Sequence, residues 1–222
     1  MAQYILSLSG GLDSGVLCAA LLAEYGEGSV EAVFFQYGSK HGPWEERAAR
    51  ALTAHFAVPL TPVDLRSVFS LTQSALLEED PRPIPKTSYA QASMNQTVVP
   101  GRNLMFASVL AALAESRSIP YVALATHSDD HHLYPDCRPT FNTALDRVIQ
   151  ESSGGAVRLS TPFGHMTKAE IVAKGATLGL PFALTRSCYE RTEESCGRCG
   201  TCQERLAAFA ANGLTDPVKY SL

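Results

Sequence analysis

The sequence predicts an α/β fold in which a parallel sheet is covered by helices on both faces, followed by a small C-terminal segment with four cysteines. Short apolar segments alternate along the chain with longer segments in which apolar residues recur at helical spacing. A glycine-rich loop follows the first apolar segment and opens a helix. Together these features indicate an α/β part over residues 1–180 and a cysteine-rich segment over residues 181–222 packed against it.

Local sequence features predict the position of each strand and helix. The expected strands are short, apolar and rich in β-branched or aromatic residues, and they cover residues 4–8, 30–37, 60–63, 121–126 and 157–160. The expected helices have apolar residues at helical spacing, and Gly26 is a natural stop for the first; they cover residues 14–25, 43–56, 103–116, 140–151 and 167–178. Between residues 71 and 97 the pattern fades around three prolines, so we expect a long loop there, with a lid over the active site as the hypothesis for its role.

Composition narrows the class of protein. The chain has 222 residues, of which 45% are hydrophobic and 18% charged, with a formal net charge of −4. An acidic balance argues against direct binding of nucleic acid, which usually needs a basic face. We find no apolar run that is expected to span a membrane and no signal peptide at the N-terminus. These features predict a cytoplasmic protein, and in that reducing compartment clustered cysteines favour metal over disulfides.

Four cysteines near the C-terminus have the spacing of a metal site. They are Cys188, Cys196, Cys199 and Cys202. Two C-x2-C steps share one cysteine, and the glycines between them allow a tight turn, so four thiolates can surround one ion. We predict one structural Zn²⁺ with a closed coordination shell that holds Arg186 and Ser187 against the sheet; free buried cysteines are the weaker alternative. The other two cysteines, Cys18 and Cys137, are expected to pack.

The loop after the first strand is predicted to bind the phosphates of ATP. It consists of Ser9, Gly10, Gly11, Leu12, Asp13 and Ser14. The two glycines let the backbone approach phosphate oxygens, and the first amides of the following helix favour an anion. Asp13 would repel phosphate, so its expected role is to orient Mg²⁺ or to cap the helix. A plain Gly-Gly turn with an ordinary cap is the alternative.

This Ser-Gly-Gly-Leu-Asp-Ser loop resembles the signature of the PP-loop ATP pyrophosphatases, a superfamily with a Rossmann-like sheet of the adenine nucleotide alpha hydrolase type. The resemblance implies adenylation of an oxygen atom and release of pyrophosphate. Members include amide-forming ligases and tRNA thiolation enzymes, so the loop alone leaves the substrate open.

Three further segments narrow the resemblance. They are Val-Pro-Gly-Arg-Asn at 99–103, Tyr-Pro-Asp-Cys-Arg-Pro at 134–139, and the C-terminal cysteines with Arg205 three residues after the last. In this order they resemble the 7-cyano-7-deazaguanine synthases of queuosine and archaeosine base synthesis, from residue 5 to residue 209. The resemblance implies that ATP and ammonia convert 7-carboxy-7-deazaguanine first to the amide and then to the nitrile, and it implies a homodimer.

Given that reaction, Arg102 and Lys168 are candidates for phosphate contacts, because cations must neutralise the charge that develops on ATP. A loop-anchoring role for Arg102 and a surface salt bridge for Lys168 are the alternatives. With Asp13 they form the predicted catalytic set. The predicted substrate-binding residues are Tyr37, His41, Asp136 and Arg138. An aspartate would accept from the N–H edge of the base and an arginine would meet its carboxylate.

The chain departs from the family pattern at two places. Gln36 and Ser39 replace the usual residues beside Tyr37, and an Asp-Asp-His-His-Leu run at 129–133 replaces an aromatic-Ser-Gly run. The run could bind Mg²⁺ or Zn²⁺, although we interpret it as a solvated loop. The departures leave open an enzyme that stops at the amide or joins another amine. A PP-loop tRNA thiolation enzyme is less favoured, and a pure zinc-binding interaction module is least favoured.

Overall fold

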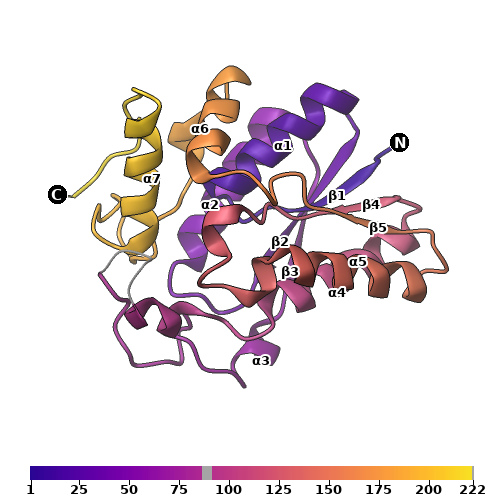
Figure 1. Ribbon diagram of the computed structural model, residues 1–222, viewed down its shortest axis with the longest axis horizontal. Coiled ribbons are helices and arrows are strands. Elements are labelled where there is room, and N and C mark those ends of the chain that lie inside the picture. Colours follow the sequence, from indigo (N-terminus) through magenta and orange to yellow (C-terminus); the bar gives the residue numbers. More distant parts are fainter. Residues whose placement is uncertain (87–91, 222) are drawn as a thin grey trace.

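Five parallel strands form one sheet in the order β3-β2-β1-β4-β5 (Figure 1). The structure is a computed structural model that describes residues 1–86 and 92–221. The strands are β1 (Tyr4–Ser7), β2 (Val30–Gln36), β3 (Leu60–Asp64), β4 (Tyr121–Ala123) and β5 (Arg158–Ser160). Because β1 and β2 are buried on both faces, they are almost continuously apolar, as expected for central strands of a parallel sheet.

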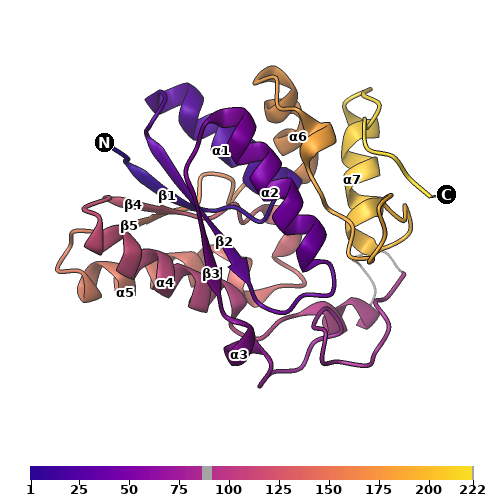
Figure 2. The same ribbon diagram turned by 180° about the vertical axis from the view of Figure 1, so that it is seen from behind.

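Helices cover both faces of the sheet (Figures 1 and 2). On one face lie α1 (Leu12–Tyr25) and α2 (Gly42–Phe56), with α6 (Lys168–Thr177) against α1 and α7 (Gly200–Ala211) against α6. On the other face lie α4 (Arg102–Ser116) and α5 (Pro139–Ser152). The short helices are α3 (Arg66–Phe69), η1 (Ala92–Thr97), η2 (Ser128–Asp130), η3 (Pro135–Cys137) and η4 (Phe182–Leu184). Each face has its own hydrophobic core.

The structure confirms the predicted fold class and every predicted strand and helix, with ends that differ by a few residues. The strand expected over 121–126 ends earlier, at Ala123, so the residues after it are free to line a site. Within the described part of the expected loop over 71–97, Leu76, Leu77 and Met94 are buried, and residues 92–97 form the short helix η1. Residues 87–91 of that loop lie outside the described residues. One helix of the cysteine-rich segment, α7, was not predicted from the sequence.

One expectation about membrane spans needs correction. Ser93–Ser116 is a helical stretch long and apolar enough to cross a membrane by length and composition. Within it, α4 buries Phe106, Ala107 and Leu110 against the sheet. Core helices of globular proteins meet the same criterion, because a helix that covers a sheet is apolar over much of its surface.

The strand order places a binding site at the carboxyl end of β1. The chain moves from β1 to β2 and β3 on one side, then crosses to β4 and β5 on the other. In open parallel sheets, ligands bind in the crevice where the order reverses in this way. The crevice here lies between the loop after β1 and the loop after β4.

A buried ion pair anchors α7 to the end of the chain. Arg205 on α7 donates from Nε to Asp216 Oδ2 at 2.6 Å and from Nη2 to Oδ1 at 2.9 Å. The two side chains are 3% and 2% exposed. Arg205 also donates to Thr185 Oγ1 at 2.7 Å. The geometry is bidentate, so both charges are well satisfied inside the protein.

We therefore expect Asp216→Asn to lower the free energy of unfolding by about 3 kcal/mol, because it leaves a buried guanidinium without its carboxylate. Urea unfolding measures the loss. Burial alone would raise the pKa of Asp216, but Arg205 lowers it below its usual value. The stabilisation is therefore full above about pH 4 and is lost as the pH falls through the folded-state pKa. The variant should show a smaller loss of stability with acid, and equal acid sensitivity of the two proteins would contradict this assignment.

Candidate active site

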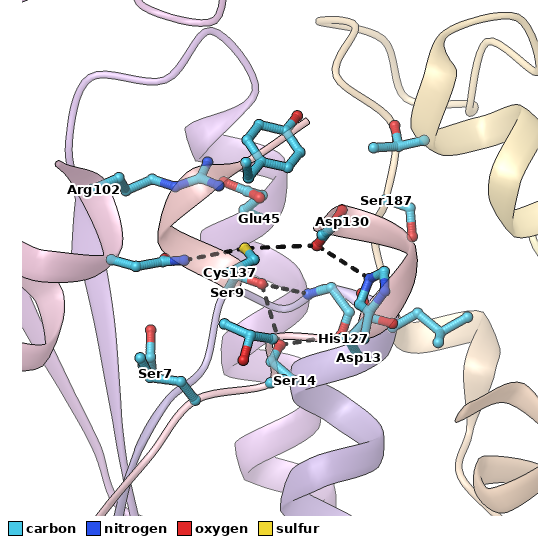
Figure 3. Close-up of a pocket in the computed structure, with 18 of the residues that line it drawn as sticks. Ser7, Ser9, Asp13, Ser14, Glu45, Arg102, His127, Asp130, Cys137 and Ser187 are labelled. Atoms are coloured by element: carbon cyan, nitrogen blue, oxygen red, sulfur yellow. Dashed lines mark hydrogen bonds and ion pairs between the residues drawn. The ribbon is translucent and has the colours of Figure 1, made fainter. Parts of the chain in front are cut away.

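A pocket opens at the predicted crevice, and both the α/β part and the C-terminal segment contribute to it (Figure 3). The loop after β1 supplies its floor, the loop after β4 and the start of α4 supply one wall, and the start of α6 with the C-terminal segment supplies the other. The predicted residues that line it are Ser9, Gly11, Leu12, Asp13, Ser14, Tyr37, His41, Arg102 and Lys168.

The loop over residues 9–14 brings together hydroxyl and amide groups that can bind an anion. Its serine hydroxyls lie together, with Ser9 Oγ 3.2 Å from Ser14 Oγ and 3.1 Å from the Gly11 amide. The residue at the N-cap of α1 is Gly11, which makes no side-chain capping hydrogen bond at this helix N-terminus. Such an N-terminus binds phosphate groups well.

Gly10 lies behind this loop rather than in the pocket lining. Its φ is +79°, and a Cβ there would lie 2.5 Å from the carbonyl oxygen of Glu45 and 2.6 Å from the amide of Ala49. Only glycine fits both the backbone angle and the close approach of α2. The glycine therefore positions the loop by packing against a helix.

Asp13 and Lys168 form an ion pair inside the pocket. Lys168 Nζ lies 2.6 Å from Asp13 Oδ2 and 3.3 Å from Glu204 Oε2 on α7. Burial opposes charge on both partners, but the ammonium lowers the pKa of Asp13 and the two carboxylates raise the pKa of Lys168. Both groups therefore stay charged at neutral pH. Thr167 fixes the lysine by capping α6 in a box with Glu170.

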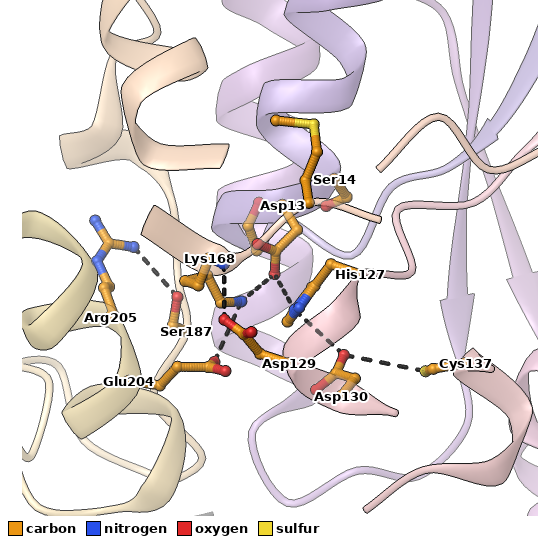
Figure 4. Close-up of polar contacts among 12 residues, drawn as sticks. Asp13, Ser14, His127, Asp129, Asp130, Cys137, Lys168, Ser187, Glu204 and Arg205 are labelled. Carbon is orange, nitrogen blue, oxygen red and sulfur yellow. Dashed lines mark hydrogen bonds and ion pairs between the residues drawn. The ribbon is translucent and has the colours of Figure 1, made fainter. Parts of the chain in front are cut away.

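The loop after β4 brings a histidine and a carboxyl group beside this pair (Figure 4). His127 Nε2 lies 3.2 Å from Asp130 Oδ2 and 3.9 Å from Asp13 Oδ2. Burial, with the nearby Lys168 ammonium, lowers the pKa of His127 to about 4, so its imidazole is neutral at pH 7. Burial, with the nearby carboxylates, raises the pKa of Asp130 to about 8.

Arg102 lies in a different part of the pocket, among aromatic rings. Its Cζ is 5.9 Å from the ring centroids of both Tyr37 and Tyr134. Tyr37 and Tyr134 are buried, and the ring of Tyr189 lies tilted against that of His41, with centroids 5.0 Å apart. No carboxylate among the described residues pairs with the Arg102 guanidinium, so its charge is available to an anionic ligand.

The four cysteines are buried together at the start of α7. Their sulfurs all lie within 4.8 Å of one another, so the group could hold a metal. Backbone amides donate to two of the sulfurs: Cys196 N to Cys188 Sγ at 3.2 Å, and Cys199 N to Cys196 Sγ at 3.3 Å. Such bonds stabilise negative charge on thiolates and are typical of metal ligands.

The cysteine-rich segment also builds the pocket wall. Arg186 and Ser187, just before the first cysteine, line the pocket, and the Arg186 amide donates to the Gly10 carbonyl at 2.8 Å. Thr201 and Glu204 line it from α7. The segment that carries the cysteines is therefore part of the same site as the loop after β1.

Two predicted substrate residues are not among the pocket lining. Asp136 Oδ2 accepts a hydrogen bond from the Asn103 backbone amide at 3.1 Å. This bond provides a partner for one of the amides in the first turn of α4 that have none within the helix. Arg138 is exposed, and its Nε donates to the His131 carbonyl at 2.8 Å. Their segment still contributes through Tyr134 and Cys137, which line the pocket. Of the departures from the family pattern, Gln36 and Ser39 lie outside the lining, whereas Asp130 is in it.

The main residues that sequence analysis missed are Glu45, His127, Tyr189 and Glu204. Glu45 follows His41 by four residues, and its Oε2 lies 3.5 Å from His41 Nε2. This spacing places two side chains on the same face of a helix and could have been recognised in the sequence. Glu204 lies two residues after the last cysteine, but nothing local indicates that it reaches Lys168.

The fold and this site define an α/β protein with a parallel sheet and a pocket at the glycine-rich loop after β1. Two solved structures share the fold. The first is a U34-tRNA thiolase NcsA from Methanococcus maripaludis with its [4Fe-4S] cluster, which has a TM-score of 0.55 and 13% identity to this chain. The match covers 96% of this chain and 64% of the neighbour. An NMN synthetase from Francisella tularensis has a TM-score of 0.52 and 14% identity over 96% of this chain and 79% of the neighbour.

Residues 3–213 match the family described as queuosine biosynthesis protein QueC, and the chain belongs to this family. A 7-cyano-7-deazaguanine synthase from Methanoregula boonei is 39% identical over 218 residues, which is 98% of this chain and 99% of the relative. Another from Desulfotalea psychrophila is 41% identical over 220 residues, 99% of each chain. The resemblance stated from sequence motifs is confirmed at the level of the family.

Proposed function

We propose that this protein is an ATP-dependent ligase that converts 7-carboxy-7-deazaguanine and ammonia to 7-cyano-7-deazaguanine. The observation that carries the proposal is the match to synthases of that name over nearly the whole of both chains. The first ATP adenylates the carboxylate and releases pyrophosphate, and ammonia then displaces AMP to give the amide. A second ATP activates the amide oxygen, and loss of AMP and a proton leaves the nitrile.

The residues support a division of the pocket into two ends. At one end, the loop over residues 9–14 and Lys168 would hold the phosphates, and Asp13 would hold the Mg²⁺ that accompanies ATP. At the other end, Tyr37, Tyr134 and Arg102 offer flat apolar faces beside a positive charge. A planar base with a carboxylate matches that chemistry.

The position of Arg102 among tyrosines leads us to assign it to the substrate carboxylate instead of to phosphate. We expect Arg102→Met to raise KM for the acid about thirtyfold, or roughly 2 kcal/mol, because a charged hydrogen bond is lost. KM for ATP should change little. Steady-state kinetics with each substrate varied in turn measures both constants.

The control is Arg147→Met, which removes an exposed arginine of α5. It should leave both constants unchanged. A rise in KM for ATP in Arg102→Met, with no change for the acid, would return Arg102 to the phosphate role.

For the cysteine cluster we propose one structural Zn²⁺. A tetrahedral ion with bonds of about 2.3 Å holds its sulfurs about 3.8 Å apart, and sulfurs within 4.8 Å of one another support a single ion of this kind. A four-iron cluster needs wider spacing, because each thiolate binds a different iron atom. Four thiolates leave no position for water, so the ion would stabilise the fold and take no part in the reaction.

The experiment for the proposed function is mass spectrometry of the base formed from 7-carboxy-7-deazaguanine, ATP, Mg²⁺ and ammonium. Nitrile is the expected product. Amide as the final product would favour the variant that stops after the first step, which the run over residues 129–133 beside the pocket motivates. No conversion of the acid would contradict the proposal.

A further inference from the structure

The proposed reaction leaves one group of polar side chains at the edge of the pocket without a role in the reaction. His127 and Asp129 come from the loop after β4, and Glu204 comes from α7 (Figure 4). One ligand atom from each of the three lies within 4.8 Å of the other two. Segments 75 residues apart in the chain thus bring an imidazole and two carboxylates to one point.

His127 has the surroundings of a metal-binding histidine. It is 2% exposed, its Nε2 lies 3.2 Å from Asp130 Oδ2, and its Nδ1 has no hydrogen-bond partner among the described residues. Buried ring nitrogens normally find a partner, because an unpaired polar atom inside a protein costs free energy. His127 therefore has a ring nitrogen available to a metal ion, and either of its nitrogens can serve as the ligand atom of this group.

The carboxylates around this point outnumber the cations that contact them. Asp13 and Glu204 pair with the ammonium of Lys168, and Asp129 Oδ2 accepts from the Lys168 backbone amide. Among residues 1–86 and 92–221, the carboxylates that pair with Lys168 Nζ are Asp13 and Glu204. Carboxylates that outnumber their cations in a partly enclosed pocket favour binding of a further cation.

We propose that His127, Asp129 and Glu204 form a second metal site, distinct from the cysteine cluster and from the Mg²⁺ that ATP carries. An imidazole with two carboxylates suits a divalent first-row transition ion such as Mn²⁺, whereas Mg²⁺ prefers oxygen ligands alone. Three protein ligands leave open positions for water or a phosphate oxygen. Binding here needs no turnover, so the test is independent of the proposed function.

The test uses full-length protein already loaded with Zn²⁺ and free of nucleotide, titrated with Mn²⁺ and followed by electron paramagnetic resonance. Zinc loading occupies the thiolates first, so Mn²⁺ reports on the nitrogen and oxygen ligands. We expect one bound Mn²⁺ per chain. Pulsed spectra of the wild-type protein should show coupling to an imidazole nitrogen, a signature that depends on no variant.

His127→Gln and Glu204→Gln should each weaken Mn²⁺ binding at least tenfold, and His127→Gln should abolish the nitrogen coupling. Glu193→Gln is the matched control, because Glu193 lies in the same C-terminal segment but pairs with Arg47 outside this pocket; it should bind Mn²⁺ normally. Zinc content and thermal unfolding verify that each variant is folded.

Three results would overturn the proposal. The first is no Mn²⁺ binding in the absence of ATP. The second is binding without nitrogen coupling. The third is binding that survives His127→Gln but is lost in Asp13→Asn, since that pattern assigns the ion to the nucleotide site.

Discussion

Lys168→Met is expected to lower kcat/KM for ATP about a thousandfold, which corresponds to roughly 4 kcal/mol of transition-state stabilisation. Adenylation places additional negative charge on the α-phosphate, and Lys168 is the buried ammonium beside the loop that would hold it. Methionine keeps the length and packing of the side chain but removes the charge. Pyrophosphate release, measured with saturating acid and varied ATP, gives the ratio.

The matched control for this prediction is Lys174→Met. Lys174 lies on the same helix, α6, but is exposed, so its loss should leave kcat/KM within twofold. Loss of Lys168 also leaves Asp13 without its nearest cation, so the unfolding midpoint of both variants has to be measured alongside. A folded Lys168→Met protein with nearly unchanged kcat/KM would refute the role of the lysine.

The second large effect concerns the cysteine cluster. Cys199→Ser should lose the metal, and we expect activity to fall below detection. Cys199 and Cys202 lie at the first turn of α7, and the same helix carries Thr201 and Glu204 into the pocket. Structural zinc binding contributes on the order of 10 kcal/mol to folding of small metal-bound segments, so the metal is needed to hold this wall in place.

Metal analysis per chain, together with limited proteolysis, measures both consequences. Cleavage after residue 186 should appear in Cys199→Ser and be absent from the wild-type protein. Cys18→Ala provides the control, because Cys18 is a buried cysteine of α1 outside the cluster, and it should keep one metal ion. A Cys199→Ser protein that stays active without metal would show that the cluster does not support the pocket.

The parts of the site that could be predicted from sequence are those whose residues all lie in one short segment of the chain. The loop over residues 9–14 combines its glycines, serines and aspartate at one strand–helix junction, and the cysteines have the spacing of one ion's ligands. Both features depend on local geometry. The same holds for the alternation of strands and helices, which follows from local periodicity.

The parts that could not be predicted depend on contacts between distant segments. Lys168 meets Glu204 only because α7 packs on α6, and α7 itself has weak sequence signals. Asp136 was expected at the substrate because its segment belongs to the family pattern. The structure directs its carboxylate to the Asn103 amide, since the backbone N–H groups at the N-terminus of a helix are donors without an intrahelical partner. Whether a side chain turns to the pocket or to the backbone is not encoded in spacing.

The central claim is that substrate oxygen is activated by transfer of AMP. Its most direct test uses 7-carboxy-7-deazaguanine with both carboxylate oxygens replaced by ¹⁸O, followed by mass spectrometry of the nucleotide and of the released phosphates. The account predicts two AMP for each nitrile, with one ¹⁸O atom in each AMP and none in pyrophosphate. Label in inorganic phosphate, with ADP as the nucleotide product, would contradict adenylation and with it the role assigned to the loop over residues 9–14.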